Sequence, residues 1–122
     1  MDDEPGVRQL GQSLLKRMGH AVTTVCDGAE TLREYARARQ AGQPYDLVIL
    51  DLTIPGGMGG REAMEKLLLV DPKVKAIVSS GYSNDLVLSN YQAHGFRGMV
   101  SKPYDITDLS HAIDQVLKGD RA

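Results

Sequence analysis

Short apolar runs alternate along the chain with longer segments in which apolar residues recur every three or four positions. Leu47 to Leu50 is a continuous apolar run with polar residues at both ends, which is typical of a strand covered by helices on both faces. Ala21 to Val25 is short and rich in β-branched residues, so it also predicts a strand. Two further short strands are predicted over Ala76 to Ser79 and Gly98 to Ser101.

The longer segments predict amphipathic helices. From Glu4 to Met18 the apolar residues fall on one helical face, with Pro5 suited to the first turn and Gly19 to the stop. Further helices are predicted over Gly28 to Ala41, Arg61 to Val70, Asp85 to His94 and Ile106 to Lys118. Strands that alternate with helices imply a parallel sheet with right-handed crossovers, and hence an α/β fold.

Composition narrows the class of protein. A chain of 122 residues fits one domain. Its 42% apolar residues, 25% charged residues and net charge of -2 are typical of a soluble globular protein. Nothing in the charge alone suggests binding to nucleic acid. The single Cys26 excludes an internal disulfide. No apolar run approaches the roughly 20 residues of a membrane helix, and no secretory signal is visible. We expect a cytoplasmic domain that does not itself contact the membrane.

Candidate chemistry follows the strand-like segments. Asp51 ends the run that begins at Leu47, and Ser80 and Lys102 follow two later strands, while Asp2 and Asp3 stand near the start. The carboxyl ends of parallel strands gather at one edge of a sheet, where ligands bind. Carboxylates, a hydroxyl and a lysine at that edge can bind a divalent cation and handle a phosphoryl group. The sequence therefore predicts a phosphoacceptor site centred on Asp51.

The order and spacing of these motifs resemble the receiver domain of two-component response regulators over nearly the whole chain. The resemblance rests on five elements, which are Asp2-Asp3, Asp51 within Leu-Asp-Leu-Thr-Ile-Pro, Pro55, Ser80-Gly81 and Lys102-Pro103. It implies a flavodoxin-like, doubly wound parallel sheet of strand order 2-1-3-4-5 with five helices. The central first strand is then largely missing, because only Met1 precedes the acidic pair.

That missing strand leads to an expectation about domain organisation. Five buried aliphatic residues would contribute on the order of 5 to 10 kcal/mol, which is comparable with the stability of a whole domain. We therefore expect residues 1–122 to form one receiver domain that was excised from a longer polypeptide. The preceding residues would be an apolar run of about five, the usual length of a strand.

The resemblance also implies a role for each motif residue. Asp51 would attack the phosphorus of a phosphohistidine on a partner kinase domain and form an acyl phosphate that later hydrolyses, while Lys102 and Ser80 would contact the transferred group. It implies a magnesium site whose direct ligands are Asp3, Asp51 and the backbone carbonyl of Thr53, with Asp2 bound through water. Mg²⁺ favours this kind of oxygen ligation.

Signal transmission is implied to pass through Ser80 and Met99. Met99 stands three positions before Lys102, where the family often has a Tyr or Phe that turns inward on phosphorylation, and methionine is more flexible than either. Tyr82 would shield the phosphoryl group from water. The face that switches, and that could form a homodimer, would comprise Asp85 to His94, Met99 to Ser101 and Ile106 to Lys118.

The Gly-Gly-Met-Gly-Gly loop at 56–60 and the Ser-Ser-Gly-Tyr-Ser segment at 79–83 look most like receiver modules of sensory hybrid histidine kinases. Such a parent would carry the kinase activity elsewhere, could be membrane-attached, and could pass the phosphoryl group to a downstream phosphotransfer domain. The glycine loop itself is not a nucleotide cradle, since no Gly-Lys-Ser/Thr follows it.

Three alternatives remain open at this point. One is a stand-alone response regulator, and another is a pseudo-receiver that docks or dimerises without phosphorylation. The third is a haloacid-dehalogenase-like phosphohydrolase, but that family normally has a second Asp two positions after the nucleophile, where this chain has Thr53.

Overall fold

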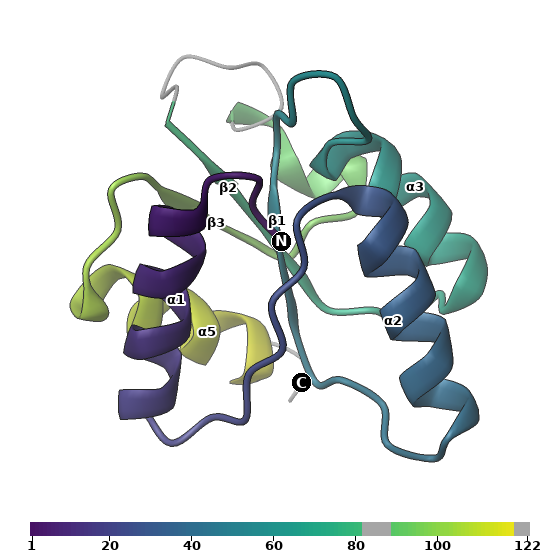
Figure 1. Ribbon diagram of the computed structural model, residues 1–122, viewed down its shortest axis with the longest axis horizontal. Helices are drawn as coiled ribbons and strands as arrows, with labels where there is room; N and C mark the ends of the chain where they lie inside the picture. Colours follow the sequence, from purple (N-terminus) through teal and green to yellow (C-terminus); the bar gives the residue numbers. More distant parts are fainter. Residues whose placement is uncertain (82–88, 119–122) are drawn as a thin grey trace.

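The computed structural model describes residues 1–81 and 89–118 and shows a parallel sheet with helices on both faces (Figure 1). The strands are β1 (Val48–Asp51), β2 (Ala76–Ser80) and β3 (Gly98–Ser101). They lie in the order β1-β2-β3, and both pairings are parallel. The predicted α/β, flavodoxin-like fold is confirmed, and these strands occupy the last three positions of the expected order 2-1-3-4-5.

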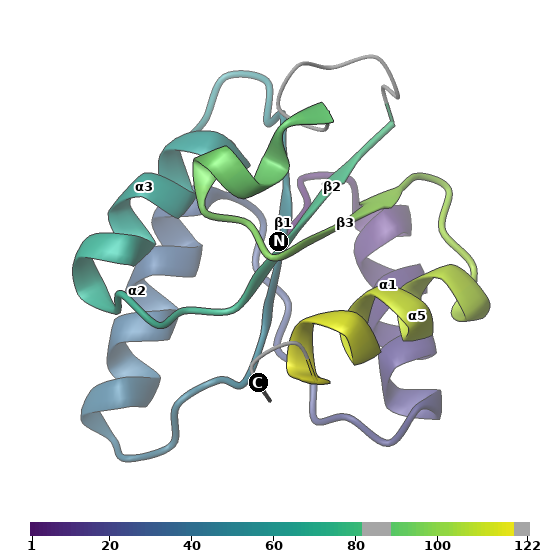
Figure 2. The same cartoon turned by 180° about the vertical axis from the view of Figure 1, so that it is seen from behind.

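Four α-helices are present in the described part of the chain. They are α1 (Pro5–Arg17), α2 (Gly28–Gln40), α3 (Gly60–Val70) and α5 (Ile106–Lys118). Figures 1 and 2 show α1 and α5 on one face of the sheet and α2 and α3 on the other. No helix in residues 1–81 or 89–118 is long and apolar enough to cross a membrane.

Local chemistry explains where the helices begin. Pro5 occupies the first turn of α1, where its missing N–H removes no helical hydrogen bond. The Asp27 carboxylate accepts a hydrogen bond of 2.9 Å from the backbone N–H of Glu30 and so caps α2. Asp105 accepts in the same way from the N–H of Asp108, at 2.8 Å, in the first turn of α5. These caps satisfy N–H groups that a helix leaves unpaired.

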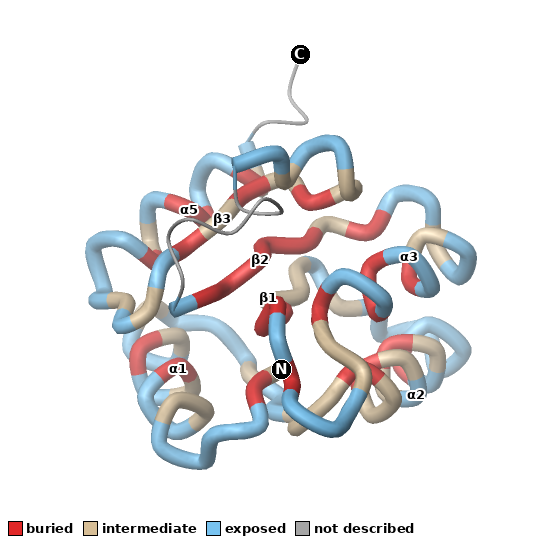
Figure 3. The backbone as a smooth tube through the Cα atoms, turned by 90° about the horizontal axis from the view of Figure 1, so that it is seen from above, coloured by how far each residue is buried: buried red, intermediate tan, exposed pale blue. Residues whose placement is uncertain are grey.

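The sheet separates two apolar clusters. Leu50 and Val78 point toward α2 and α3, whereas Ile77 and Val100 point toward α1 and α5, as the twofold period of a strand requires. All five residues of β2 are buried, and Figure 3 shows this strand buried along its length. A strand covered on both faces carries a continuous apolar run, which is why the sequence pattern located it.

The prediction of a strand over Ala21 to Val25 is wrong, because this segment has no strand structure. A strand needs a hydrogen-bonded neighbour, and of the described residues only Met1 and Asp2 bond between this segment and β1. Met1 bonds to β1 on one side, because its amino group donates to the carbonyl of Ile49 at 2.8 Å and its carbonyl accepts from the N–H of Asp51 at 3.1 Å. Asp2 bonds to the other side, where its N–H donates to the carbonyl of Val25 at 3.1 Å. This single rung stands where the central strand of the expected fold would end.

The expected helix over Asp85 to His94 is only partly testable. Residues 82–88, including Tyr82, lie outside the described residues, so the expected role of Tyr82 stays a prediction. Tyr91–His94 forms a short 3-10 helix rather than the end of an α-helix.

Candidate functional site

The carboxyl edge of the sheet brings Asp2, Asp51 and Lys102 together. Asp51 is the last residue of β1, and Lys102 follows β3 directly. The backbone N–H of Lys102 donates to the carbonyl of Ser80 at 2.9 Å and so continues the ladder between β2 and β3. Asp2 reaches the same edge through the rung it shares with Val25. The topology therefore assembles three of the predicted site residues from distant parts of the sequence.

The Lys102 ammonium lies between the two carboxylates. Its Nζ is 2.7 Å from Oδ2 of Asp2 and 3.0 Å from Oδ2 of Asp51. Asp2 and Asp51 are each 5% exposed, and the Lys102 side chain is 15% exposed. Two buried carboxylates repel each other unless a cation compensates them, and Lys102 supplies that charge.

Burial and charge shift the pKa values of this trio. Burial raises the pKa of the Asp51 carboxyl, the hydrogen bond from Lys102 opposes this, and the Asp2 carboxylate adds to it. Burial alone would lower the pKa of Lys102, but its hydrogen bonds to Asp2 and Asp51 outweigh burial and raise it. Lys102 therefore stays cationic across the neutral range.

The acidic residues also fit a divalent cation. One carboxylate oxygen from each of Asp2, Asp3 and Asp51 can be chosen so that all three lie within 4.8 Å of one another. Asp3 is exposed, so its carboxylate has access to solvent and to an incoming ion. Mg²⁺ prefers such oxygen ligands and keeps several waters, so one or two of these carboxylates suffice as direct ligands.

A cleft of about 510 Å³ opens over this edge. It is lined by Asp3, Asp51, Thr53, Ser80 and Lys102, which are all members of the predicted site. The N–H of Thr53 lies 3.4 Å from Oδ1 of Asp51, which is a weak hydrogen bond. The structure thus places every predicted acceptor and ligand residue at one edge, whereas their individual roles stay predictions.

Met99 lies apart from this cleft. It is half-buried in β3, opposite Val78, and it packs against the cluster between the sheet and helices α2 and α3. It is not among the residues that line the cleft. Its expected part in a switch therefore stays a prediction.

Sequence reasoning missed the function of two glycines. A Cβ on Gly59 would lie 2.5 Å from the carbonyl oxygen of Leu52, and one on Gly60 would lie 2.7 Å from that of Asp51. Both contacts are closer than real Cβ atoms show. The glycines let α3 begin directly against the end of β1, which holds the loop after Asp51 close to the site. The glycine-rich pattern was visible, but it does not reveal close packing.

Tyr104 is a second residue that the sequence did not single out. It lines the cleft at the carboxyl edge, and burial raises the pKa of its hydroxyl. Its position two residues after Lys102 carries no signal by itself. The intervening Lys102–Pro103 peptide bond is cis.

A second group of potential metal ligands lies at the start of α2 and consists of Cys26, Asp27 and Glu30. The Cys26 thiol donates to Oε2 of Glu30 at 2.5 Å, and Asp27 caps the helix. These internal hydrogen bonds explain the cluster without an ion.

Comparison with known families and proteins identifies relatives of the chain. Residues 1–114 match the family model described as response regulator receiver domain. The chain is 30% identical over 111 residues to the chemotaxis protein CheY of Treponema pallidum, covering 91% of this chain and 74% of that protein. It is 28% identical over 118 residues to the sensor kinase CckA of Brucella abortus, covering 97% of this chain but only 12% of that protein.

Solved structures agree on the fold. A response regulator receiver domain protein from Clostridium thermocellum superposes with a TM-score of 0.84 at 24% identity, covering 98% of this chain and 92% of that one. The receiver domain of the sensor histidine kinase PA1611 from Pseudomonas aeruginosa, whose active-site cleft coordinates a magnesium ion, superposes with a TM-score of 0.82 at 21% identity. The coverage is 96% of this chain and 93% of that one.

Proposed function

The chain belongs to the response regulator receiver domain family, and we propose that it accepts a phosphoryl group on Asp51 in a two-component phosphorelay. One observation carries this proposal. The Lys102 ammonium lies between the buried carboxylates of Asp2 and Asp51, at the carboxyl edge of a parallel sheet and beside a cleft large enough for a phosphoryl group.

The transfer that this site supports is a substitution at phosphorus. An oxygen of the Asp51 carboxylate attacks the phosphorus of a phosphohistidine, and the P–N bond breaks as a P–O bond forms. The electron pair of the broken bond stays on the imidazole nitrogen, which takes up a proton. Water later attacks the acyl phosphate, which releases inorganic phosphate and restores the carboxylate. Positioning and charge stabilisation contribute most of the catalysis of such transfers.

Asp3 and Asp51 would hold Mg²⁺ directly, with the Thr53 carbonyl as a further ligand and Asp2 acting through water. The support for this assignment is the donor set itself, since all three carboxylates converge within 4.8 Å. Bound Mg²⁺ would neutralise charge on the phosphoryl oxygens during transfer. The magnesium ion in the cleft of the PA1611 receiver domain is consistent with this proposal.

Lys102 and Ser80 would stabilise the transferred group. Lys102 is a point charge on a flexible stem, so it can leave one carboxylate and reach a phosphoryl oxygen in the same cleft. Ser80 lies at the end of β2 and lines that cleft, which supports a contact between its hydroxyl and the same group.

We further propose that the domain serves within a sensory hybrid histidine kinase, with a phosphohistidine domain as donor and a downstream phosphotransfer domain as acceptor. The similarity to CckA supports this context, although the chain spans only 12% of that protein. The similarity to a CheY supports the alternative of a stand-alone regulator. In either setting the domain would promote only its own phosphorylation and dephosphorylation, and we propose a cytoplasmic location for it.

The test is intact-mass measurement after incubation with a small-molecule phosphodonor, with and without Mg²⁺. We expect one added phosphoryl group that depends on Mg²⁺ and disappears with hydroxylamine, which cleaves acyl phosphates. Asp51→Asn should abolish the adduct, whereas Asp46→Asn, at an exposed carboxylate just before β1, should leave it unchanged. No adduct on a folded protein that binds Mg²⁺ would favour a pseudo-receiver. Donor turnover without any adduct would favour a phosphohydrolase.

A further inference from the structure

Every polar group of Asp2 has a partner in the described part of the chain. Its carboxylate accepts the N–H of Glu4 on Oδ1 at 3.0 Å and contacts the Lys102 ammonium through Oδ2 at 2.7 Å. Its own N–H donates to the carbonyl of Val25 at 3.1 Å, and its carbonyl accepts from Nη1 of Arg8 at 2.8 Å. Four separate interactions therefore hold this residue, two through the side chain and two through the backbone.

The next residue, Asp3, lacks such anchors on its side chain. Its carboxylate is exposed and makes no hydrogen bond or ion pair with residues 1–81 or 89–118. Even so, one of its oxygens lies within 4.8 Å of oxygens from Asp2 and Asp51. The course of the backbone before Asp3 therefore sets the space that this carboxylate can reach.

The hydrogen bond from Arg8 fixes that part of the backbone. The carbonyl of Asp2 and the N–H of Asp3 belong to one planar peptide group, so a bond that orients the carbonyl also orients the peptide bond that leads into Asp3. Arg8 is half-buried in the first turn of α1, and its own N–H donates to the carbonyl of Glu4 at 3.0 Å. The donor that holds the Asp2 carbonyl is thus carried by a helix.

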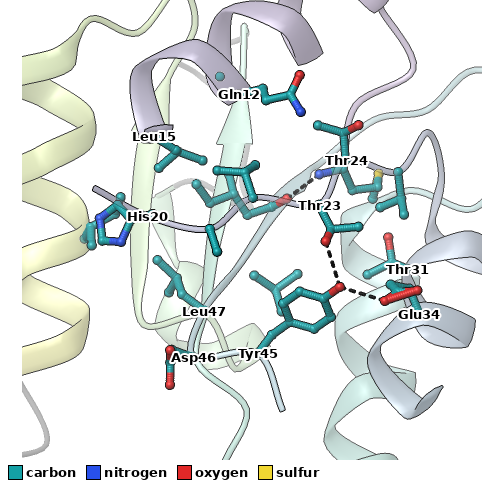
Figure 4. A pocket seen from close by; sticks show the side chains of 18 of the residues that line it. Gln12, Leu15, His20, Thr23, Thr24, Thr31, Glu34, Tyr45, Asp46 and Leu47 are labelled. Atoms are coloured by element: carbon teal, nitrogen blue, oxygen red, sulfur yellow. Dashed lines mark hydrogen bonds between the residues drawn. The ribbon is translucent and has the colours of Figure 1, made fainter. Parts of the chain in front are cut away.

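The other backbone anchor of Asp2 comes from the opposite face of the sheet. Residues 21–25 border a groove of about 580 Å³ that β1 borders on its other side (Figure 4). The Tyr45 hydroxyl lies 2.9 Å from Oγ1 of Thr23 and 2.6 Å from Oε2 of Glu34, which ties this segment to α2. Val25 accepts from Asp2 at the end of the same segment. Arg8 supplies the matching anchor from α1, which lies on the other face (Figure 1).

We propose that Arg8 is a positioning residue for phosphoryl transfer, because its hydrogen bond to the Asp2 carbonyl directs the Asp3 carboxylate toward the cation. This inference rests on the proposed function. The effect runs through the hydrogen bond and not through the charge of the guanidinium. A positive charge beside three carboxylates repels a second cation, so charge alone would make Arg8 an obstacle to Mg²⁺ binding. Position and charge therefore predict opposite changes in Mg²⁺ affinity when Arg8 is replaced.

The experiment compares the unchanged chain with Arg8→Met, which removes both donor and charge, and with Arg8→Lys, which keeps the charge and a donor of shorter reach. Arg17→Met is the matched control, because Arg17 is an exposed arginine in the last turn of the same helix. Calorimetric titration measures Mg²⁺ affinity, and ¹⁵N relaxation measures the order parameter of the Asp3 N–H without Mg²⁺. The rate of phosphorylation by a small-molecule donor is then followed against Mg²⁺ concentration. The first two measurements do not depend on phosphorylation.

We expect Arg8→Met to weaken Mg²⁺ binding by about tenfold. The order parameter of the Asp3 N–H should fall from about 0.85, typical of rigid backbone, toward about 0.6. The Mg²⁺ concentration for half-maximal phosphorylation should rise with the dissociation constant, while the rate at saturating Mg²⁺ stays unchanged. Arg8→Lys should restore most of the affinity, and Arg17→Met should not weaken binding. A general loss of stability would not produce this split between affinity and saturated rate.

The proposal is overturned if Arg8→Met binds Mg²⁺ as tightly as the unchanged chain or more tightly, because that is the effect of charge alone. It is also overturned if Arg8→Lys binds as weakly as Arg8→Met. Should Arg8→Met fail to fold, Arg8→Gln gives the same test of sign, since it removes the charge and keeps a shorter N–H donor. If the unchanged chain binds no Mg²⁺, the proposed function fails, and the order parameter of Asp3 still decides the role of Arg8.

Discussion

The carboxyl edge of the sheet and the groove between residues 21–25 and β1 meet at Asp2, which contacts Lys102 at the edge and also lines the groove, yet the two regions differ in their backbone and side-chain pairing. At the edge, Lys102 joins Asp2 and Asp51 through short ion pairs, and the cleft above collects the remaining site residues. In the groove, β1 and residues 21–25 face each other without backbone hydrogen bonds beyond the single rung at Met1 and Asp2, as far as the structure describes them.

The two regions depend on different parts of the molecule. The site needs only the ends of strands, because its interactions are made by side chains that project from those ends. The groove between residues 21–25 and β1 is bordered by backbone groups, whose hydrogen bonds must be made by another extended segment, by side chains or by water.

Replacing Lys102 removes the ion pairs at the carboxyl edge, and we expect it to cause the largest loss in unfolding free energy. Lys102→Met leaves two buried carboxylates without their cation, and breaking such a buried pair costs about 3 to 5 kcal/mol. Urea unfolding should show this loss, and added Mg²⁺ should restore part of it by supplying positive charge. Lys66→Met is the matched control, because Lys66 forms an exposed ion pair with Glu62, worth about 0.5 kcal/mol or less. Equal losses of unfolding free energy in Lys102→Met and Lys66→Met would contradict this role of Lys102.

Gly60→Ala tests whether close packing fixes the loop after Asp51. The added Cβ would lie 2.7 Å from the Asp51 carbonyl, so the start of α3 must move away from the site. We expect a loss of about 1 to 3 kcal/mol in unfolding free energy, together with weaker Mg²⁺ binding. Gly6→Ala is the control, since nothing lies within 4 Å of that position in α1 and alanine should stabilise the helix by about 0.5 to 1 kcal/mol. Unchanged stability and Mg²⁺ affinity in Gly60→Ala would refute the packing argument.

Tyr45→Phe tests the groove between residues 21–25 and β1, and we expect it to cause the smallest loss in unfolding free energy. Hydrogen bonds from Arg37 and then Tyr45 lower the pKa of Glu34 to about 2. A depressed carboxyl pKa contributes stability above its unfolded value of 4.5, and this contribution is lost as the pH falls through about 2. The variant should therefore be slightly less stable at pH 7, and the difference should shrink between pH 4.5 and 2. Thermal unfolding at several pH values measures this difference in stability. An equal difference at pH 7 and pH 2.5 would contradict the prediction.

The sequence predicted the regular elements where periodicity and burial agree. The helix expected over 28–41 is observed over Gly28–Gln40, and the run at Leu47 to Leu50 becomes β1 with a shift of one residue. The residues of the site were also predictable, because a strand end can be located from the end of an apolar run. Asp51 and Lys102 meet for this reason.

Other features depend on partners that are distant in sequence. Ala21 to Val25 has the composition of a strand, but among the described residues its one backbone hydrogen bond to a neighbouring segment joins Val25 to Asp2. Composition cannot report whether a segment has a hydrogen-bonded neighbour. Gly60 is required by the approach of α3 to β1, which only the packed structure shows. Tyr104 lines the cleft because of the path of the chain after Lys102, and no motif marks that path.

The location of the phosphoryl group is the most direct test of the central claim. After treatment with a small-molecule phosphodonor and Mg²⁺, borohydride reduction converts an aspartyl phosphate to homoserine, which peptide mapping detects. The account predicts homoserine at position 51 and nowhere else. Modification at position 2 or 3, a stable phosphate on Ser80, or no modification of the folded protein would contradict it.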